Sequence, residues 1–192
     1  MFPTDQLRDA FGQSVSFQRF VESGAPEGHD PQWHQRHAQL ELDDAQRRLV
    51  ESFTRDMKVL CMTGTWCGDC ALQGSAMQRI AEANPGRIDL RFISRNDAPQ
   101  IQVRVPINAG YRVPVTFFMA EDFEPVARYG DRSLSRYRSM ARKALPGGGA
   151  GVVLAEPPAD PVRTVLQEML DEFERVQLLL RLSPRLRELH AD

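Results

Sequence analysis

The chain has 192 residues, which suits one domain with additions and allows a full hydrophobic core to be buried. Its formal net charge of −2 argues against a strongly basic, nucleic-acid-binding protein. No apolar run approaches the roughly 20 residues needed to cross a bilayer. Residues 1–5 lack the basic and apolar regions of a secretory signal. We therefore expect a cytoplasmic protein that binds neither nucleic acid nor membrane.

Residues 1–56 are expected to form a helical extension that packs on the rest of the chain. Three short segments there have apolar residues at helical spacing: 4–11, 16–22 and 43–53. Residues 23–31 contain two prolines and two glycines, which predicts a loop. Residues 32–42 fit neither a helix nor a strand clearly.

Residues 57–145 carry the pattern of an α/β core. An apolar run at 57–63 predicts a buried strand, and alternating apolar residues at 88–94 predict a second strand with one buried face. A helix is predicted between them, at 71–84. A strand, a helix and a strand in succession favour parallel pairing of the two strands.

A β-hairpin and another helix are predicted in the second half of this core. The hairpin strands are expected at 115–120 and 124–129, after a connector that Pro99 and Pro106 interrupt. A helix capped by Asp131 or Ser133 follows. Its spacing predicts one apolar side, made of Leu134, Tyr137, Ala141 and Leu145.

Residues 146–192 are expected to be a glycine-rich break followed by a helical extension. The break is the Pro-Gly-Gly-Gly-Ala-Gly run at 146–151. The segment 160–180 is the most amphipathic in the chain, and a last short helix is predicted to start at Ser183-Pro184. We expect the long helix to pack on its own domain, although its wide apolar face leaves open a monomer or a homodimer.

Two of the three cysteines, Cys67 and Cys70, lie where the first predicted strand gives way to a helix. A thiol at the start of a helix is favoured as thiolate by the helix dipole and by unpaired backbone N–H groups. The first cysteine of such a pair is the exposed one. We therefore expect Cys67 to attack a substrate disulfide and Cys70, one turn further in, to resolve the mixed disulfide.

A metal site is the less favoured interpretation of the two cysteines. A structural zinc ion needs four ligands, and a lone CxxC supplies two. The third cysteine, Cys61, is expected deep in a strand, and the histidines lie far away in the sequence. No metal ligands and no cofactor are predicted.

The sequence resembles the thioredoxin superfamily in two motifs and in the order of its elements. Trp66-Cys67-Gly68-Asp69-Cys70 is similar to the WCGPC motif of that family, and Val113-Pro114 precedes a predicted strand as the family's cis-proline does. The WCGDC form with helical extensions is most similar to a bacterial thioredoxin-like branch. The resemblance covers roughly residues 57–145. It implies a thioredoxin-like fold, with a mixed sheet of about four strands flanked by helices and extra helices at both termini.

The same resemblance implies roles for the neighbours of the cysteines. Trp66 would shield the thiols and contact the substrate, and Gly68 and Asp69 would tune the site. Val113, before a cis Pro114, would offer backbone groups to a substrate chain.

Two positions depart from the family pattern. The family usually carries a buried carboxylate six residues before the first cysteine, where this chain has Cys61. We interpret Cys61 as a small buried hydrophobic residue. Asp69 replaces the usual proline, and its charge is expected to disfavour the Cys67 thiolate and to make the couple more reducing.

The sequence thus predicts an enzyme, a thiol–disulfide oxidoreductase that reduces protein or small-molecule disulfides. Its expected partners are such a substrate and an electron donor, for instance a thioredoxin reductase or a low-molecular-weight thiol. A binding module with regulatory cysteines on the same scaffold and a metal-binding protein are the alternatives, because a fold alone does not separate them.

Overall fold

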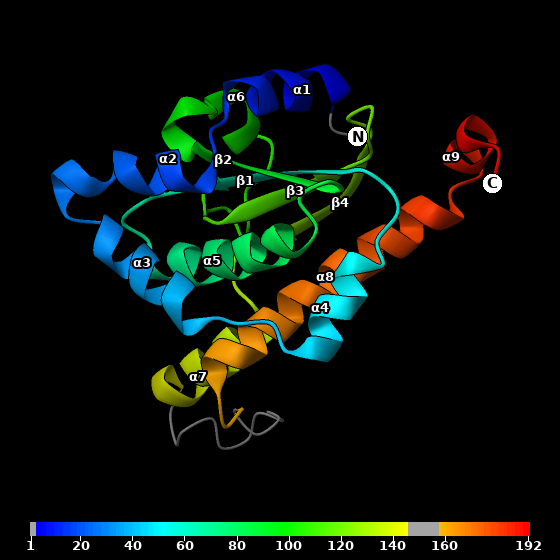
Figure 1. Ribbon diagram of the computed structural model, residues 1–192. Helices are drawn as coiled ribbons and strands as arrows, with labels where there is room; N and C mark the ends of the chain where they lie inside the picture. Colours follow the sequence, from blue (N-terminus) through cyan, green and yellow to red (C-terminus); the bar gives the residue numbers. More distant parts are fainter. Residues whose placement is uncertain (1–2, 146–157) are drawn as a thin grey trace.

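A four-stranded mixed sheet forms the centre of the computed structural model, which describes residues 3–145 and 158–192 (Figure 1). Its strands follow the spatial order β2-β1-β3-β4. β1 pairs with β2 in parallel and with β3 antiparallel, and β3 and β4 form a hairpin. The strands are β1 (Met57–Thr63), β2 (Ile88–Ser94), β3 (Val115–Met119) and β4 (Pro125–Gly130). Each strand lies within one residue of its predicted bounds, which confirms the predicted α/β class and mixed sheet.

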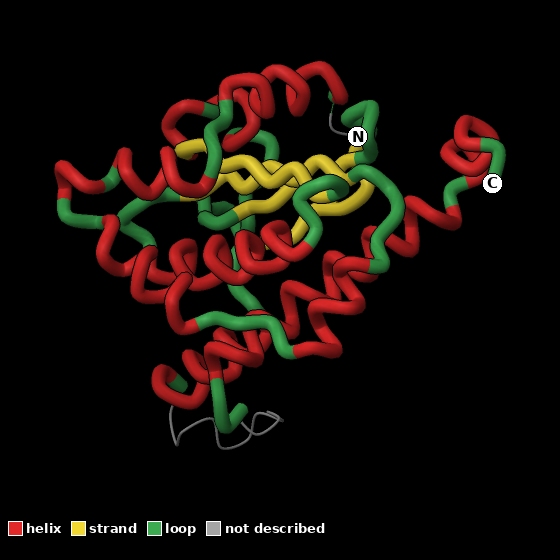
Figure 2. The backbone as a smooth tube through the Cα atoms, viewed as in Figure 1, coloured by secondary structure: helices red, strands yellow, loops and turns green. Residues whose placement is uncertain are grey.

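Helices cover both faces of this sheet (Figures 1 and 2). α1 (Thr4–Gln13) and α6 (Pro99–Gln102) cover one face, where a core cluster includes Leu7, Leu60 and Ile101. α5 (Gly68–Ala83) lies against the other face. A second core cluster lies on the α5 side of the sheet. Adjacent residues of β1 point into opposite clusters, since Leu60 belongs to the first and Cys61 to the second.

Two further helices of the N-terminal segment pack on the core, one against β2 and the other against α5. α2 (Phe17–Ser23) is capped by Ser16, and α4 (Asp44–Glu51) begins with a capping box of Asp43 and Gln46. Just before α2, Val15 bonds Phe92 across the free edge of β2. These helices confirm two of the short helices predicted in this segment.

The stretch predicted as a loop at 23–31 is partly helical. It holds a short 3-10 turn, η1 (Ala25–Glu27), and the start of α3 (Asp30–Gln39). Pro31 lies in the first turn of α3, where its missing N–H costs nothing, so this proline starts a helix and does not break one. α3 also settles the ambiguous segment 32–42 as mainly helix, and it packs along α5.

The C-terminal helices close the α5 side of the molecule. α7 (Leu134–Ala144) follows β4, and α8 (Pro161–Leu182) packs against α5, α7 and β4 through an apolar face that includes Phe173. A last helix, α9 (Pro184–His190), ends the chain. The glycine-rich break predicted at 146–151 lies outside the described residues. In the described part of the chain, no helix is both long and apolar enough to cross a membrane.

The prediction that α7 packs through an apolar side is wrong. Leu134, Tyr137 and Leu145 are 56%, 39% and 40% exposed. The residue that α7 buries is Ser135, whose backbone N–H and hydroxyl both donate to the Glu168 carboxylate of α8 at 2.8 and 3.0 Å. A polar anchor at the start of the helix therefore sets its orientation, and helical spacing of apolar residues does not.

Candidate functional site

The two cysteines lie at the carboxyl end of β1, in the centre of the sheet. β1 ends at Thr63, and α5 begins at Gly68, three residues earlier than the sequence predicts. Cys67 occupies the N-cap of α5 with extended backbone angles, and its Sγ accepts a hydrogen bond from the backbone N–H of Cys70 at 3.2 Å. The thiol thus takes the position that a capping serine or aspartate usually holds.

The environments of the two thiols differ sharply. Cys67 is partly exposed, whereas Cys70 is fully buried. The pKa of Cys67 is lowered from 9.0 to about 7, mainly by a hydrogen bond from the Cys70 thiol. Burial opposes this shift, and the hydrogen bond from the Cys70 backbone N–H adds to it. Burial, followed by the contact with Cys67, raises the pKa of Cys70 well above its usual value. At neutral pH the arrangement therefore favours a thiolate at Cys67 beside a protonated Cys70.

The loop before β3 faces the exposed thiol. Met62 of β1 pairs with Val115 of β3, so the residues that precede Val115 come to the end of β1 where the cysteines lie. The Val113–Pro114 bond is cis, as the resemblance implies, and the Val113 carbonyl oxygen is 4.0 Å from Cys67 Sγ. Because the Val113 carbonyl is this close to Cys67 Sγ, the Val113 backbone would lie beside any group bound to Cys67.

Trp66 stands at the surface next to the motif. Its side chain is 50% exposed, and the Arg95 guanidinium lies 5.0 Å from the centre of its ring. The same Arg95 donates to the backbone carbonyl of Tyr111 at 3.1 Å. The ring is thereby linked to the connector that leads to Val113 and remains open to a partner on its outer side.

Asp69 is paired with two arginines that the sequence analysis did not single out. Arg132 Nε donates to one carboxylate oxygen at 2.6 Å, and Arg136 Nε donates to the other at 2.7 Å. The negative charge of Asp69 raises the pKa of Cys67, but less than the hydrogen bonds from Cys70 lower it. The two guanidinium groups offset part of that charge, which explains how the motif carries an acid and still has a thiolate-favouring first cysteine.

A buried carboxylate, Asp131, holds the arginine segment in place. It accepts hydrogen bonds from Arg112 at 3.2 Å, from Arg132 at 3.0 Å and from the Tyr137 hydroxyl. Its backbone carbonyl accepts a further bond from Gln73 of α5 at 2.9 Å. The strand register gives the signal that could have found this segment, because Gly130 pairs with Val115 and the next residues must come to the site.

The N-terminal helices hold the loop before the cysteines from the other side. The Thr65 carbonyl accepts two hydrogen bonds from α3, from Gln32 Nε2 and from Trp33 Nε1, each at 2.8 Å. His29 Nδ1 lies 3.0 Å from the Thr65 hydroxyl. Neither sequence spacing nor a motif indicates these contacts. They show that the segment before β1 positions the loop that leads to Cys67.

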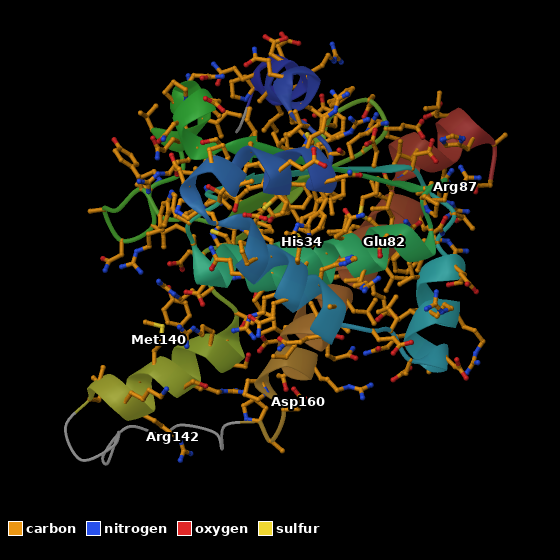
Figure 3. The ribbon with its side chains drawn as sticks, turned by 60° about the vertical axis from the view of Figure 1, so that its left-hand side comes forward. His34, Glu82, Arg87, Met140, Arg142 and Asp160 are labelled. Carbon is orange, nitrogen blue, oxygen red and sulfur yellow. The ribbon has the colours of Figure 1, made fainter. Side chains whose placement is uncertain are left out.

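The interior of α3 fixes this contact. Trp33 is fully buried, and its ring packs edge-on against Phe17, Phe20 and Phe92. Figure 3 shows α3, which carries His34, lying across α5, which carries Glu82 near its far end. His34 itself is exposed, while His37 bonds Glu82 at 3.0 Å.

Cys61 lies within the sheet, away from solvent. It is fully buried, and burial raises its pKa to about 12. It therefore remains a neutral thiol throughout the physiological pH range and supplies no acid or base there. Within residues 3–145 and 158–192, no group of three or more histidine, cysteine or carboxylate side chains is arranged to hold a metal ion.

Comparisons with known proteins agree with this fold. The model of the thioredoxin family matches residues 14–143, which is more than half of the chain. The chain therefore belongs to the thioredoxin superfamily. The comparison with curated proteins gives no match.

Two solved structures share the fold. One is the crystal structure of a Pseudomonas aeruginosa protein of unknown function, with a TM-score of 0.61 and 19% identity over 92% of this chain and 97% of that one. The other is an HIV epitope scaffold, with a TM-score of 0.60 and 18% identity over 88% of this chain and 95% of that one. At these identities the likeness shows the fold alone.

Proposed function

We propose that this protein is a thiol–disulfide oxidoreductase that reduces disulfides through Cys67 and Cys70. The observation that carries the proposal is the contrast between the two thiols. Cys67 is accessible and has a pKa lowered to about 7, and Cys70 is buried and has a raised pKa. A nucleophile that is ionised near neutrality and a resolving thiol held protonated beside it are what this reaction needs.

The reaction conserves atoms and electrons in two exchanges. The Cys67 thiolate attacks one sulfur of the substrate disulfide, that S–S bond breaks, and the departing substrate thiolate takes a proton from solvent. Cys70 then gives its proton to solvent and attacks Cys67 Sγ, so that the S–S bond between Cys67 and the substrate breaks. The departing substrate thiolate takes up a proton, and a Cys67–Cys70 disulfide is left. Two electrons pass from the protein to the substrate. A dithiol reductase or a low-molecular-weight thiol returns them in the next half-cycle.

Several neighbouring groups support this role. The Cys70 backbone N–H stabilises the Cys67 thiolate before attack. The Val113 carbonyl and the exposed face of Trp66 flank Cys67, where a substrate chain would lie. A cytoplasmic location suits a reductase, because thiols are kept reduced in that compartment.

Reduction of insulin disulfides by dithiothreitol tests the proposal. We expect the protein to accelerate the reaction, and Cys67→Ser to abolish the acceleration because it removes the attacking thiol. Cys70→Ser should leave the first attack intact and accumulate the mixed disulfide, which mass spectrometry detects. Equal rates with the wild-type protein and Cys67→Ser would rule the proposal out.

A further inference from the structure

A pocket of about 480 Å³ opens directly beside the redox motif. Gly68, Asp69 and Leu72 of α5 form one wall, α7 and the start of α8 form the others, and Arg36 of α3 reaches its edge. Figure 3 shows α7, marked by Met140 and Arg142, meeting the start of α8, marked by Asp160, below the α3–α5 pair. Four helices from distant parts of the sequence thus converge next to Cys67.

Positive charge dominates the lining of this pocket. Three cations, Arg36, Arg136 and Lys143, face one carboxylate, Asp69. Asp69 is already shared between Arg136 and a second arginine outside the pocket. Arg36 donates to the neutral Gln39 at 2.9 Å, and neither Arg36 nor Lys143 forms an ion pair within the described ranges. The pocket therefore has positive charge that its own carboxylate does not balance.

The pocket also lies within reach of a chain bound at Cys67. Gly68 and Asp69 directly follow Cys67, so one wall begins at the residue next to the nucleophile. An extended peptide advances about 3.3–3.6 Å per residue. Side chains two to four residues from a substrate cysteine attacked by Cys67 would then fall beside Arg36, Arg136 and Lys143.

We infer that this pocket binds acidic side chains that flank the target cysteine of a polypeptide substrate. The inference rests on the proposed disulfide reduction, since it names the substrate that Cys67 would select. The carboxylates pair with cations that line the pocket, and Leu72 contacts the aliphatic part of the bound segment. Surface ion pairs are individually weak, so the pocket sets selectivity among disulfides and not the ability to reduce them.

Two matched peptides test this inference. Each is a six-residue chain joined to its own copy by one disulfide, with either two glutamates or two glutamines after the cysteine. The reduced full-length protein is mixed with each peptide, and the released peptide thiol is measured by chromatography. We expect the glutamate peptide to react faster, by roughly fivefold. The advantage should shrink between low and high salt, because salt screens exposed charges.

Charge reversal in the pocket identifies the groups responsible. Arg36→Glu and Lys143→Glu should each lower the glutamate-to-glutamine rate ratio by about threefold. Arg136 is left in place because it also contacts Asp69. Arg19→Glu makes the same change in net charge on exposed α2, outside the pocket, and should leave the ratio unchanged. Circular dichroism melting curves check that all three variants fold.

The outcomes separate the pocket from the proposed function. Equal wild-type rates for the two peptides, or an equal fall in the ratio with Arg19→Glu, would overturn the pocket and leave the reductase standing. If the wild-type protein and Cys67→Ser fail alike to reduce either peptide, both inferences are overturned. A ratio that falls with Arg36→Glu and Lys143→Glu alone supports the acidic substrate.

Discussion

Arg132 Nε donates to the Asp69 carboxylate at 2.6 Å, across 63 positions of sequence. This contact places a cation from the segment after β4 on the acid that lies between Cys67 and Cys70. The charge of Asp69 raises the pKa of the neighbouring Cys67 thiol, and a cation at hydrogen-bond distance counters that effect. The Arg132–Asp69 ion pair therefore acts on the pKa of the Cys67 thiol through Asp69.

Substitution of Asp69 by asparagine should lower the pKa of Cys67. The variant loses the negative charge that lies next to the thiolate and that raises its pKa. A lower pKa increases the thiolate fraction but makes each thiolate less nucleophilic. A tenfold increase in thiolate fraction, with an about threefold loss of nucleophilicity, should speed alkylation by iodoacetamide at pH 6 by about threefold. The Cys67–Cys70 couple should become more oxidising, because its reduced form is stabilised. Thiolate absorbance at 240 nm measures the shift.

Arg136→Ala is the matched control for Asp69→Asn, because the ion pair that Arg136 forms is with Asp69. It leaves the carboxylate less neutralised, so the pKa of Cys67 should rise and alkylation at pH 6 should slow. In the Asp69→Asn background the same substitution should have little effect on the pKa. A shift of equal size in both backgrounds would show that Arg136 acts on Cys67 independently of Asp69.

The pH dependence of the first attack should follow Cys67 alone. Its pKa is lowered to about 7, so the thiolate fraction and the alkylation rate rise from pH 5 and level off above pH 8. Cys70 remains protonated over that range because burial raises its pKa, and it adds no second step. A midpoint near 9, as for an ordinary thiol, would contradict this account.

The Cys70→Ala variant checks the cause of the low pKa. The Cys70 thiol is the main group that lowers the pKa of Cys67, while the backbone N–H at position 70 survives the substitution. The midpoint of the alkylation profile should therefore move to higher pH without returning fully to 9. Mass spectrometry after quenching at each pH follows the modification of Cys67.

Local signals in the sequence were sufficient for the sheet and for the position of the cysteines. The apolar run of β1 and the Asn84-Pro85-Gly86 stop after α5 are short-range patterns, and they bracket the motif closely. The direction in which Cys67 and Cys70 face follows from the helix start. The fold and its mixed sheet were therefore predictable, whereas the redox activity itself remains a proposal.

Contacts between distant segments were not predictable from such patterns. The Trp33 indole reaches Thr65 across 32 positions, and Arg132 reaches Asp69 only because the β3–β4 hairpin turns the chain back toward α5. Leu134 belongs to a set of apolar residues at helical spacing and is nevertheless exposed. The bond from Ser135 to Glu168 turns α7 so that Ser135, and not Leu134, faces the interior. In each case a tertiary hydrogen bond decides the outcome.

Cys61 should be dispensable for catalysis. It occupies the position of the family's buried acid, but burial raises its pKa to about 12, so it carries no charge at neutral pH. Cys61→Ala should keep insulin reduction within about twofold of the wild-type rate and cost about 1 kcal/mol of stability through the lost volume. Urea unfolding measures the cost. Unchanged alkylation of Cys67 with a lost second exchange would instead give Cys61 a role in resolution.

Substitution of Gly74 by alanine should destabilise the fold, although alanine is the better helix former. A Cβ at Gly74 would lie 2.6 Å from Cζ3 of Trp33 and 3.2 Å from Cε1 of Phe92, and both are rigid buried rings. Overpacking costs about 1–3 kcal/mol, which exceeds the helical gain of about 1 kcal/mol. A Cβ added at Gly12 in α1 would have nothing within 4 Å, so Gly12→Ala should be neutral or stabilising. Urea unfolding measures the free energy of unfolding of both variants. Equal stabilisation would show that Trp33 can move away from α5. A loss confined to Gly74→Ala would show that the ring is held against α5, where it bonds Thr65.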